Sequence, residues 1–210
     1  MASPARHQCL IYSGSPTTHL RGLAAQTVQK LNENYRCLHL NSPKSITALE
    51  LHLRILGVDV AQETARGSLV LSSGQDHLMN GCFNVDGMIG RLETTIDRAL
   101  SDGYRGLWAT GDMSWEFGPN RDFAKLAEYE WRLEELFKAR TALSGICQYH
   151  SDTLPREAMR DGLGSHTSLF INETLSMVNP YYVRRPVQGL GAMGHGAIDA
   201  AIEDLCRLGN

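Results

Sequence analysis

The sequence lacks the long apolar run that a membrane-spanning helix requires, because no segment of its 210 residues approaches about 20 consecutive apolar positions. Residues 1–7 also contain no apolar stretch of the kind found in secretory signal peptides. The formal net charge of -3 is spread along the chain without a block of Lys and Arg, whereas a nucleic-acid surface needs such a block. We therefore expect a cytoplasmic protein that binds neither membranes nor nucleic acid directly.

The sequence also lacks the paired cysteines of a disulfide framework or a structural zinc site. Its five cysteines are odd in number and scattered, and none forms a Cys-x2-4-Cys pair. Three shorter spacings do combine zinc-type ligands, namely His7-x-Cys9, Cys37-x-His39 and Cys147-x-x-His150. Because these spacings are not those of known zinc motifs, buried structural Cys and His residues are the favoured interpretation. We expect no metal and no cofactor.

Two catalytic signatures are missing as well. No Gly-x-Ser-x-Gly elbow supports serine catalysis. The segment 12–20 stands where a phosphate loop would follow the first strand, yet it has one glycine and no Lys, with His19 near the position of the Lys. We favour a tight turn in which Ser15 or Thr17 caps the next helix, although a helix start of this kind still attracts a single anion.

What the sequence does contain is a regular alternation of strand and helix patterns. Apolar periodicity predicts strands at 9–12, 36–40, 69–71, 106–110, 143–149 and 166–171, and helices at 20–31, 46–56, 85–100 and 123–137, with a short helix after Pro155. The segment 72–84 loses this pattern and is predicted to be a loop. The alternation predicts an α/β fold with three layers and a mostly parallel central sheet.

Residues 106–110 form an apolar run bounded by glycines, which is typical of a strand buried on both faces. Asp112 and Trp115 follow it, at the carboxyl end where open α/β sheets bind ligands. Asp112 can orient a ligand there or simply form the turn, and the two roles are about equally supported. The residues that we predict to surround a ligand at this edge are Ser13, Asp112, Trp115, Glu130, Tyr149 and His150.

The last part of the chain has a different character. The run 189–196 is rich in glycine, and residues 192–208 then place Ile198, Ile202 and Leu205 on one helical face. We divide the chain into a domain over residues 6–182 and a linker with an amphipathic helix over residues 183–210.

Several short motifs, in their order and spacing, resemble a known family. They are His7-Gln-Cys9-Leu-Ile-Tyr12, Gly111-Asp-Met-Ser-Trp115, Tyr129-Glu130, Cys147-Gln-Tyr149, His166 and Asn179-Pro-Tyr181. Over residues 6–182 the chain is similar to the MEDS domain, the methanogen/methylotroph sensory domain named for a dichloromethane-responsive repressor. The resemblance implies a RecA-like fold with a degenerate phosphate loop, which agrees with the missing Lys.

The resemblance also implies a sensory role with small hydrocarbon derivatives as ligands. In this family the domain is often fused to DNA-binding or kinase modules that act in signal transduction and transcription regulation, and no such segment is recognisable here. We expect a non-catalytic cytosolic sensory domain that signals through a protein partner or through self-association. The alternative is a RecA-like protein that binds or hydrolyses nucleotides with an unconventional phosphate site.

Overall fold

A seven-stranded sheet forms the centre of the molecule in the computed structural model, which describes residues 6–15, 17–183 and 195–208. The strand order is β3-β2-β6-β7-β1-β8-β9, and only β9 runs antiparallel to its neighbour. The strands are β1 (His7–Tyr12), β2 (Arg36–Leu40), β3 (Leu69–Ser72), β6 (Leu107–Asp112), β7 (Leu143–His150), β8 (Ser168–Asn172) and β9 (Leu175–Val178). The predicted parallel sheet, with the strand after residue 106 in its interior, is confirmed.

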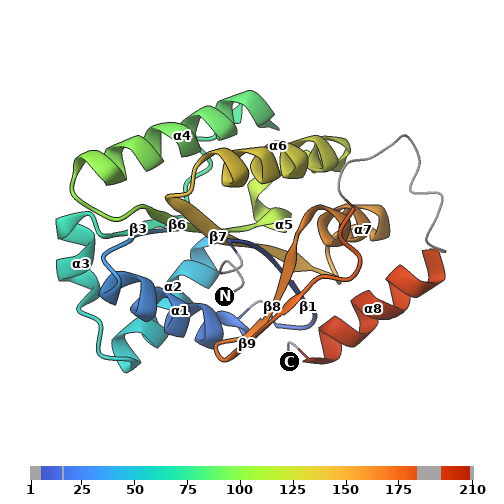
Figure 1. Cartoon of the computed structure of the whole chain (residues 1–210), viewed down its shortest axis with the longest axis horizontal. Helices are drawn as coiled ribbons and strands as arrows, with labels where there is room; N and C mark the ends of the chain where they lie inside the picture. Colours follow the sequence, from blue (N-terminus) through green and yellow to red (C-terminus); the bar gives the residue numbers. More distant parts are fainter. Residues whose placement is uncertain (1–5, 16, 184–194, 209–210) are drawn as a thin grey trace.

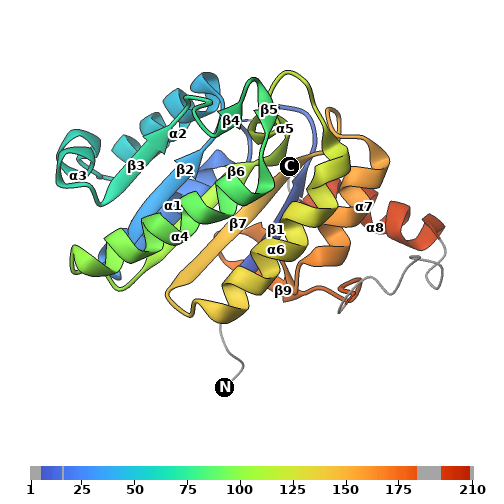
Figure 2. The same ribbon diagram turned by 90° about the horizontal axis from the view of Figure 1, so that it is seen from above.

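Helices cover both faces of this sheet (Figures 1 and 2). One face carries α4 (Val85–Ser101), α6 (Leu126–Ala139), α7 (Arg156–Ser165) and α8 (His195–Leu208), whose apolar residues belong to one core cluster. A second core cluster joins the other face to α1 (Leu20–Asn32), α2 (Pro43–Ile55) and α3 (Val60–Arg66). The predicted three-layer α/β architecture is therefore confirmed.

The segment predicted as a loop at 72–84 instead contains a short hairpin, so that prediction was wrong. Strands β4 (Leu78–Met79) and β5 (Cys82–Phe83) pair antiparallel around Asn80 and Gly81. Both turn residues have positive φ, 53° and 76°, which a two-residue hairpin of this type requires and which Asn-Gly adopts readily. The hairpin lies beside α5 (Met113–Glu116), because Asn120 donates to the backbone oxygen of Gly81 and His77 contacts that of Glu116.

Helix boundaries correct three further expectations. The start of α1 has His19 at its N-cap with no side-chain cap bond, so the predicted cap by Ser15 or Thr17 was wrong. Helix α3 and strand β9 were not predicted. The long helix expected from residue 123 begins as the 3-10 turn η1 (Phe123–Lys125) and continues as α6.

The predicted C-terminal helix is present as α8, with Ile198, Ile202 and Leu205 buried against the domain. Arg160 of α7 holds it through two bonds to Asp199, at 2.9 and 2.6 Å, and Arg156 adds a bond of 3.1 Å to Glu203. Residues 192–194 of this predicted segment, and most of the Gly-rich run, lie outside the described residues. The division of the chain at residue 182 stays a prediction. None of the helices among the described residues is long and apolar enough to cross a membrane.

Candidate functional site

Polar side chains from three parallel strands and from the start of α1 meet at the carboxyl ends of the strands. We call Tyr12, His19, Asp112, Gln148 and His150 the strand-end cluster. The Tyr12 hydroxyl donates to Asp112 Oδ2 at 2.6 Å, and His19 Nε2 donates to Gln148 Oε1 at 2.8 Å. These bonds connect β1, β6, β7 and the start of α1, which is the edge where ligands bind in open α/β sheets.

Three aromatic rings of the strand-end cluster pack against one another. The Tyr12 ring lies 3.9 Å from the His19 ring and 4.8 Å from the His150 ring, measured between centroids. Burial lowers the pKa of His19 to about 4, so this side chain is neutral at physiological pH. The position that would hold the Lys of a phosphate loop therefore carries no positive charge, as the sequence indicated.

Both carboxylate oxygens of Asp112 accept hydrogen bonds. Besides accepting from Tyr12, it accepts from the Trp115 backbone N at 3.1 Å and so caps α5. Burial raises the pKa of Asp112 even though these bonds act against the rise. Asp112 therefore forms the turn into α5, and its role toward a ligand stays a prediction.

The other predicted residues fall in separate places. His150 Nε2 lies 3.0 Å from the Gly14 oxygen, and Ser13 is half-buried in the same loop. The half-buried Trp115 has its ring 5.3 Å from that of His77. Glu130 and Tyr149 lie together under α6, where the Tyr149 hydroxyl donates to Glu130. The structure thus brings the six predicted residues into three groups instead of one pocket.

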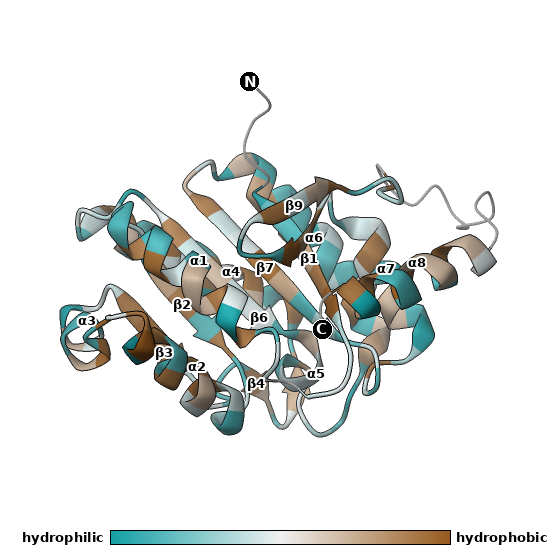
Figure 3. Cartoon of the chain, turned by 90° about the horizontal axis from the view of Figure 1, so that it is seen from below, coloured by the Kyte–Doolittle hydropathy of each residue, from teal (hydrophilic) through white to brown (hydrophobic). Residues whose placement is uncertain are grey.

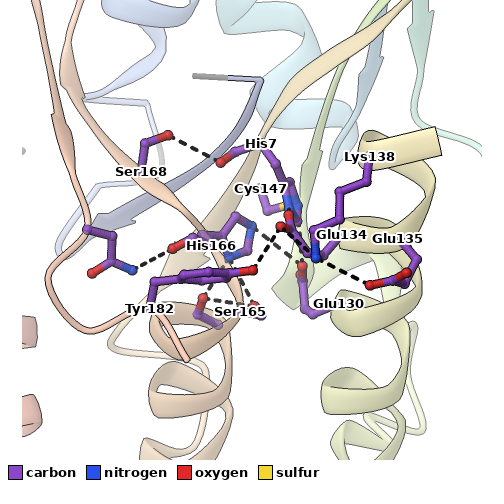
Figure 4. A network of polar contacts seen from close by, with 12 residues as sticks. His7, Glu130, Glu134, Glu135, Lys138, Cys147, Ser165, His166, Ser168 and Tyr182 are labelled. Carbon is purple, nitrogen blue, oxygen red and sulfur yellow. Dashed lines mark hydrogen bonds and ion pairs between the residues drawn. The ribbon is translucent and has the colours of Figure 1, made fainter. Parts of the chain in front are cut away.

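Glu130 belongs to a second set of polar groups between the sheet and α6 (Figure 4). We call His7, Glu130, Cys147 and His166 the buried His-Glu-Cys cluster, since one N, O or S atom of each lies within 4.8 Å of the others. His7 comes from β1, Glu130 from α6, Cys147 from β7, and His166 from the end of α7. Burial raises the pKa of Glu130 to about 8 and lowers those of His7 and His166.

Sequence spacing did not reveal this second cluster. His7 and Cys147 each appeared in a short pair, with Cys9 and His150, but the structure joins them across two neighbouring strands. His150 points instead to Gly14, and His39 bonds Thr27 on the opposite face at 3.1 Å. The only usable signal was a resemblance that includes His7, Glu130, Cys147 and His166 among its motifs.

Several cavities are present among the described residues, and none of four with volumes of about 320 to 510 Å³ is lined by the six predicted residues. The largest of these, about 510 Å³, lies where the loop after β7 meets α7 and α8. We call it the C-terminal cavity; its lining is Ser151, Asp152, Leu154, Arg156, Met159, Ile202, Glu203, Cys206 and Arg207. Another, of about 450 Å³, lies between α1 and the β8–β9 hairpin. Figure 3 shows the ribbons of α1 and β9 from below.

The fold defines the chain as a three-layer α/β domain with a mostly parallel sheet. Comparison with family profiles is more specific. Residues 6–167 match the profile described as "MEDS: MEthanogen/methylotroph, DcmR Sensory domain", and the chain belongs to this family. The predicted resemblance is confirmed, and with it membership of a sensory-domain family. No curated protein matches the chain significantly.

Proposed function

We propose that this chain is a non-catalytic sensory domain that binds a small molecule in the C-terminal cavity and passes the signal on through α8. The observation that carries the proposal is the position of that cavity, whose wall is formed by the loop after β7, by α7 and by the last described helix, α8. Its volume of about 510 Å³ lies within the range of about 300 to 1,000 Å³ for small-molecule sites. Membership of a sensory family supports the same role.

The cavity is coupled to the strand-end cluster by short bonds. Asp152, in its wall, accepts from the Gly14 backbone N at 2.8 Å. His150, two residues earlier, stacks on Tyr12, which in turn bonds Asp112. In this proposal the predicted residues Asp112 and His150 do not contact the ligand. They support the loop that lines the cavity. Their role is to hold 151–154 in one conformation.

The lining of the cavity suggests the chemistry of the ligand. Leu154, Met159 and Ile202 offer apolar surface, whereas Arg156 and Glu203 add charged groups. Such a wall suits a small molecule with an apolar body and one polar or polarisable group. Short haloalkanes and alcohols have this character, and they belong to the hydrocarbon derivatives that the family resemblance implies as ligands.

A signal requires that the ligand favour one arrangement of α8 over another. Helix α8 is attached by a narrow apolar stripe and by the ion pairs of Arg156 and Arg160, of which Arg156 also lines the cavity. A ligand that contacts Arg156 and Ile202 therefore either weakens or strengthens the attachment of α8 to the rest of the domain. The proposed receiver is a protein partner or a second copy of the chain.

The edge strand β9 supports self-association as one route. All four of its residues are exposed, and it pairs with β8 on one side only. Leu175, Met177 and Val178 are among its exposed apolar side chains. An edge with unpaired backbone groups of this kind is a ready surface for strand pairing between copies.

The test is a titration of the full chain with dichloromethane and with 1-butanol, followed by hydrogen exchange and mass spectrometry. We expect either probe to change exchange in residues 151–154 and 198–208. Cys206→Trp fills the cavity from its half-buried rim and should weaken binding at least about tenfold. Leu100→Trp, at an exposed end of α4, is the matched control and should bind like the wild type.

The rival function is a RecA-like enzyme that uses nucleotides, and the RecA-like assignment is itself part of the proposal. Asp112 and Glu116 at the end of β6 are the residues that favour this rival, since carboxylates there can hold a magnesium ion. Calorimetry with ATP, GTP and Mg²⁺ separates the two functions. Micromolar binding or turnover would support the enzyme, and their absence supports the sensory domain.

A further inference from the structure

The buried His-Glu-Cys cluster is built around a single point. His7 Nε2 lies 3.6 Å from Glu130 Oε2 and 3.6 Å from Cys147 Sγ, and His166 Nε2 lies 3.5 Å from Glu130 Oε2. Figure 4 shows the two imidazoles and the carboxylate turned toward one another from three different elements. Four metal-type donor atoms therefore converge, and they come from β1, α6, β7 and the residue that ends α7.

Both imidazoles are held by bonds at Nδ1, so that Nε2 of each ring is turned toward the cluster. His7 Nδ1 donates to Glu134 Oε2 at 2.9 Å, and His166 Nδ1 donates to the Gly162 oxygen at 2.6 Å. A proton on each Nδ1 leaves each Nε2 as an acceptor that faces the cluster. Carboxylate and backbone-carbonyl partners of this kind are the usual outer partners of metal-bound histidines, because they fix the tautomer and the ring orientation.

Two of the four atoms at the centre have no hydrogen-bond partner, whereas His7 Nε2 and Cys147 Sγ contact each other. Glu130 Oε2 and His166 Nε2 are fully buried and unpaired, although Glu130 Oε1 accepts from Tyr149. Buried polar atoms are nearly always paired in folded proteins, and two acceptors that face each other need something positive between them. The candidates are a proton and a metal ion.

The spacing favours a metal ion. Zinc bonds of about 2.0 to 2.3 Å to N, O and S place the ligand atoms of a tetrahedron about 3.3 to 3.6 Å apart. Three of the six separations among the four atoms, from 3.5 to 3.6 Å, match that range, and all four atoms lie within 4.8 Å of one another. A hydrogen-bonded pair of nitrogen and oxygen atoms would instead stand near 2.7 to 3.2 Å.

The charges also balance. Two neutral histidines, one carboxylate and one thiolate neutralise a divalent cation, so the filled site is uncharged inside the core, where an unbalanced charge is costly. The neighbouring carboxylate of Glu134 is balanced separately by Lys138, whose Nζ lies 3.3 Å from Oε1. Glu134 is thus free to act as the partner of His7 instead of as a ligand.

We propose that His7, Glu130, Cys147 and His166 bind one divalent transition-metal ion, zinc being the best match, in a closed four-coordinate site. The donor set of imidazole, thiolate and carboxylate suits zinc and cobalt better than magnesium or calcium. With four protein ligands the site has no open position, so it fastens β1, β7, α6 and α7 together and does no chemistry. The site shares no residue with the C-terminal cavity, so it is tested independently of the proposed ligand.

The test begins with the wild-type chain expressed with zinc and analysed for metal by elemental mass spectrometry. The zinc is then exchanged for Co²⁺ by unfolding and refolding, and the absorption spectrum is recorded. We expect one metal per chain, the visible bands of tetrahedral Co²⁺, and a thiolate-to-cobalt charge-transfer band. Cys147→Ser should abolish the charge-transfer band, and His166→Gln should lower Zn²⁺ affinity by more than about 100-fold.

Cys37→Ser and His39→Gln are the matched controls, because they change a buried thiol and a buried imidazole on the opposite face of the sheet. Both should keep the metal and its spectrum. Glu134→Gln removes only the outer partner of His7 and should weaken affinity by about 10- to 100-fold.

A measurement on the wild type alone guards against variants that fail to fold. Free Zn²⁺ at one hundred times Kd should raise Tm by about 5 to 10 °C relative to the chelated protein. Absence of metal from the wild type, together with no Co²⁺ spectrum and no change in Tm, would show that the cluster holds only a proton and would overturn the proposal. Loss of the charge-transfer band in Cys37→Ser with its retention in Cys147→Ser would also overturn it.

Discussion

Asp112 shows how a residue that looks like a ligand contact can be an anchor. Its two oxygens accept from the Tyr12 hydroxyl and from the Trp115 backbone, and the side chain is 5% exposed. Both oxygens are therefore already bonded within the fold. At this scale the carboxylate fixes the end of β6 to β1 and starts α5.

We predict that Asp112→Ala lowers the free energy of unfolding by about 2 to 4 kcal/mol, because it removes a helix cap and leaves the buried Tyr12 hydroxyl without an acceptor. Asp112→Asn keeps an oxygen that can accept one of the two bonds and should cost less. Urea unfolding of both variants measures the difference. A variant Asp112→Ala as stable as the wild type would mean that this carboxylate is not an anchor.

His39 gives a pH dependence that is independent of both proposed sites. Burial lowers its pKa to about 3, and its Nε2 lies 3.1 Å from Thr27 Oγ1. Below its unfolded pKa, near 6.5, the unfolded chain binds a proton that the folded chain does not, so stability falls as pH decreases from about 6.5 toward 3. Above 6.5 this contribution is fully present and constant.

His39→Gln should therefore flatten the acid side of the stability profile. Between pH 8 and pH 5 the free energy of unfolding should fall by about 2 kcal/mol less in the variant than in the wild type. One proton over about 1.5 pH units corresponds to about that free energy. Urea unfolding at the two pH values checks this. His52→Gln on α2 serves as the control, and equal slopes for His39→Gln and the wild type would disprove the assignment.

At the scale of elements, periodicity predicted the long helices and interior strands because their burial follows a simple pattern. Helix α4 and strand β2 occur where the pattern placed them. The missed elements are short: α3 has seven residues, and β9 is exposed along its length. An exposed strand has no buried apolar face, so apolar periodicity does not indicate it. For the β4–β5 hairpin, the turn pair Asn80-Gly81 is the only signal in the sequence.

The second cluster could not have been predicted from spacing for a related reason. Local motifs report ligands that share one loop, whereas His7 and Cys147 are brought together by the pairing of β1 with β7. Glu130 joins them only because α6 packs over that pair. Sheet topology decides such contacts, and the order of strands is not encoded in the spacing of residues within any one of them.

Helix α8 is the element that passes the signal on in the proposed function. Ile202 is fully buried at the centre of its apolar stripe. We predict that Ile202→Ala costs about 2 to 4 kcal/mol of attachment and speeds hydrogen exchange in α8 while β7 stays protected. Leu208→Ala, at the exposed end of the same helix, is the control. Faster exchange throughout the sheet would show that α8 is part of the cooperative core and not a separable element.

At the scale of the whole molecule, the sheet is covered by helices on both faces, and the C-terminal cavity lies at the junction with the last described helix. The three-layer architecture followed from the sequence. The pocket did not, because the described cavity is lined mainly by α7, α8 and the loop after β7. Those segments meet only through tertiary packing.

The central claim is that a small ligand in the C-terminal cavity changes the attachment of α8. The most direct measurement is hydrogen exchange of the full chain with and without saturating dichloromethane. The account predicts altered protection in residues 151–154 and 198–208 of the wild type, lost in Cys206→Trp and kept in Leu100→Trp. The result that would contradict it is that dichloromethane binds elsewhere on the chain and leaves hydrogen exchange unchanged in both segments.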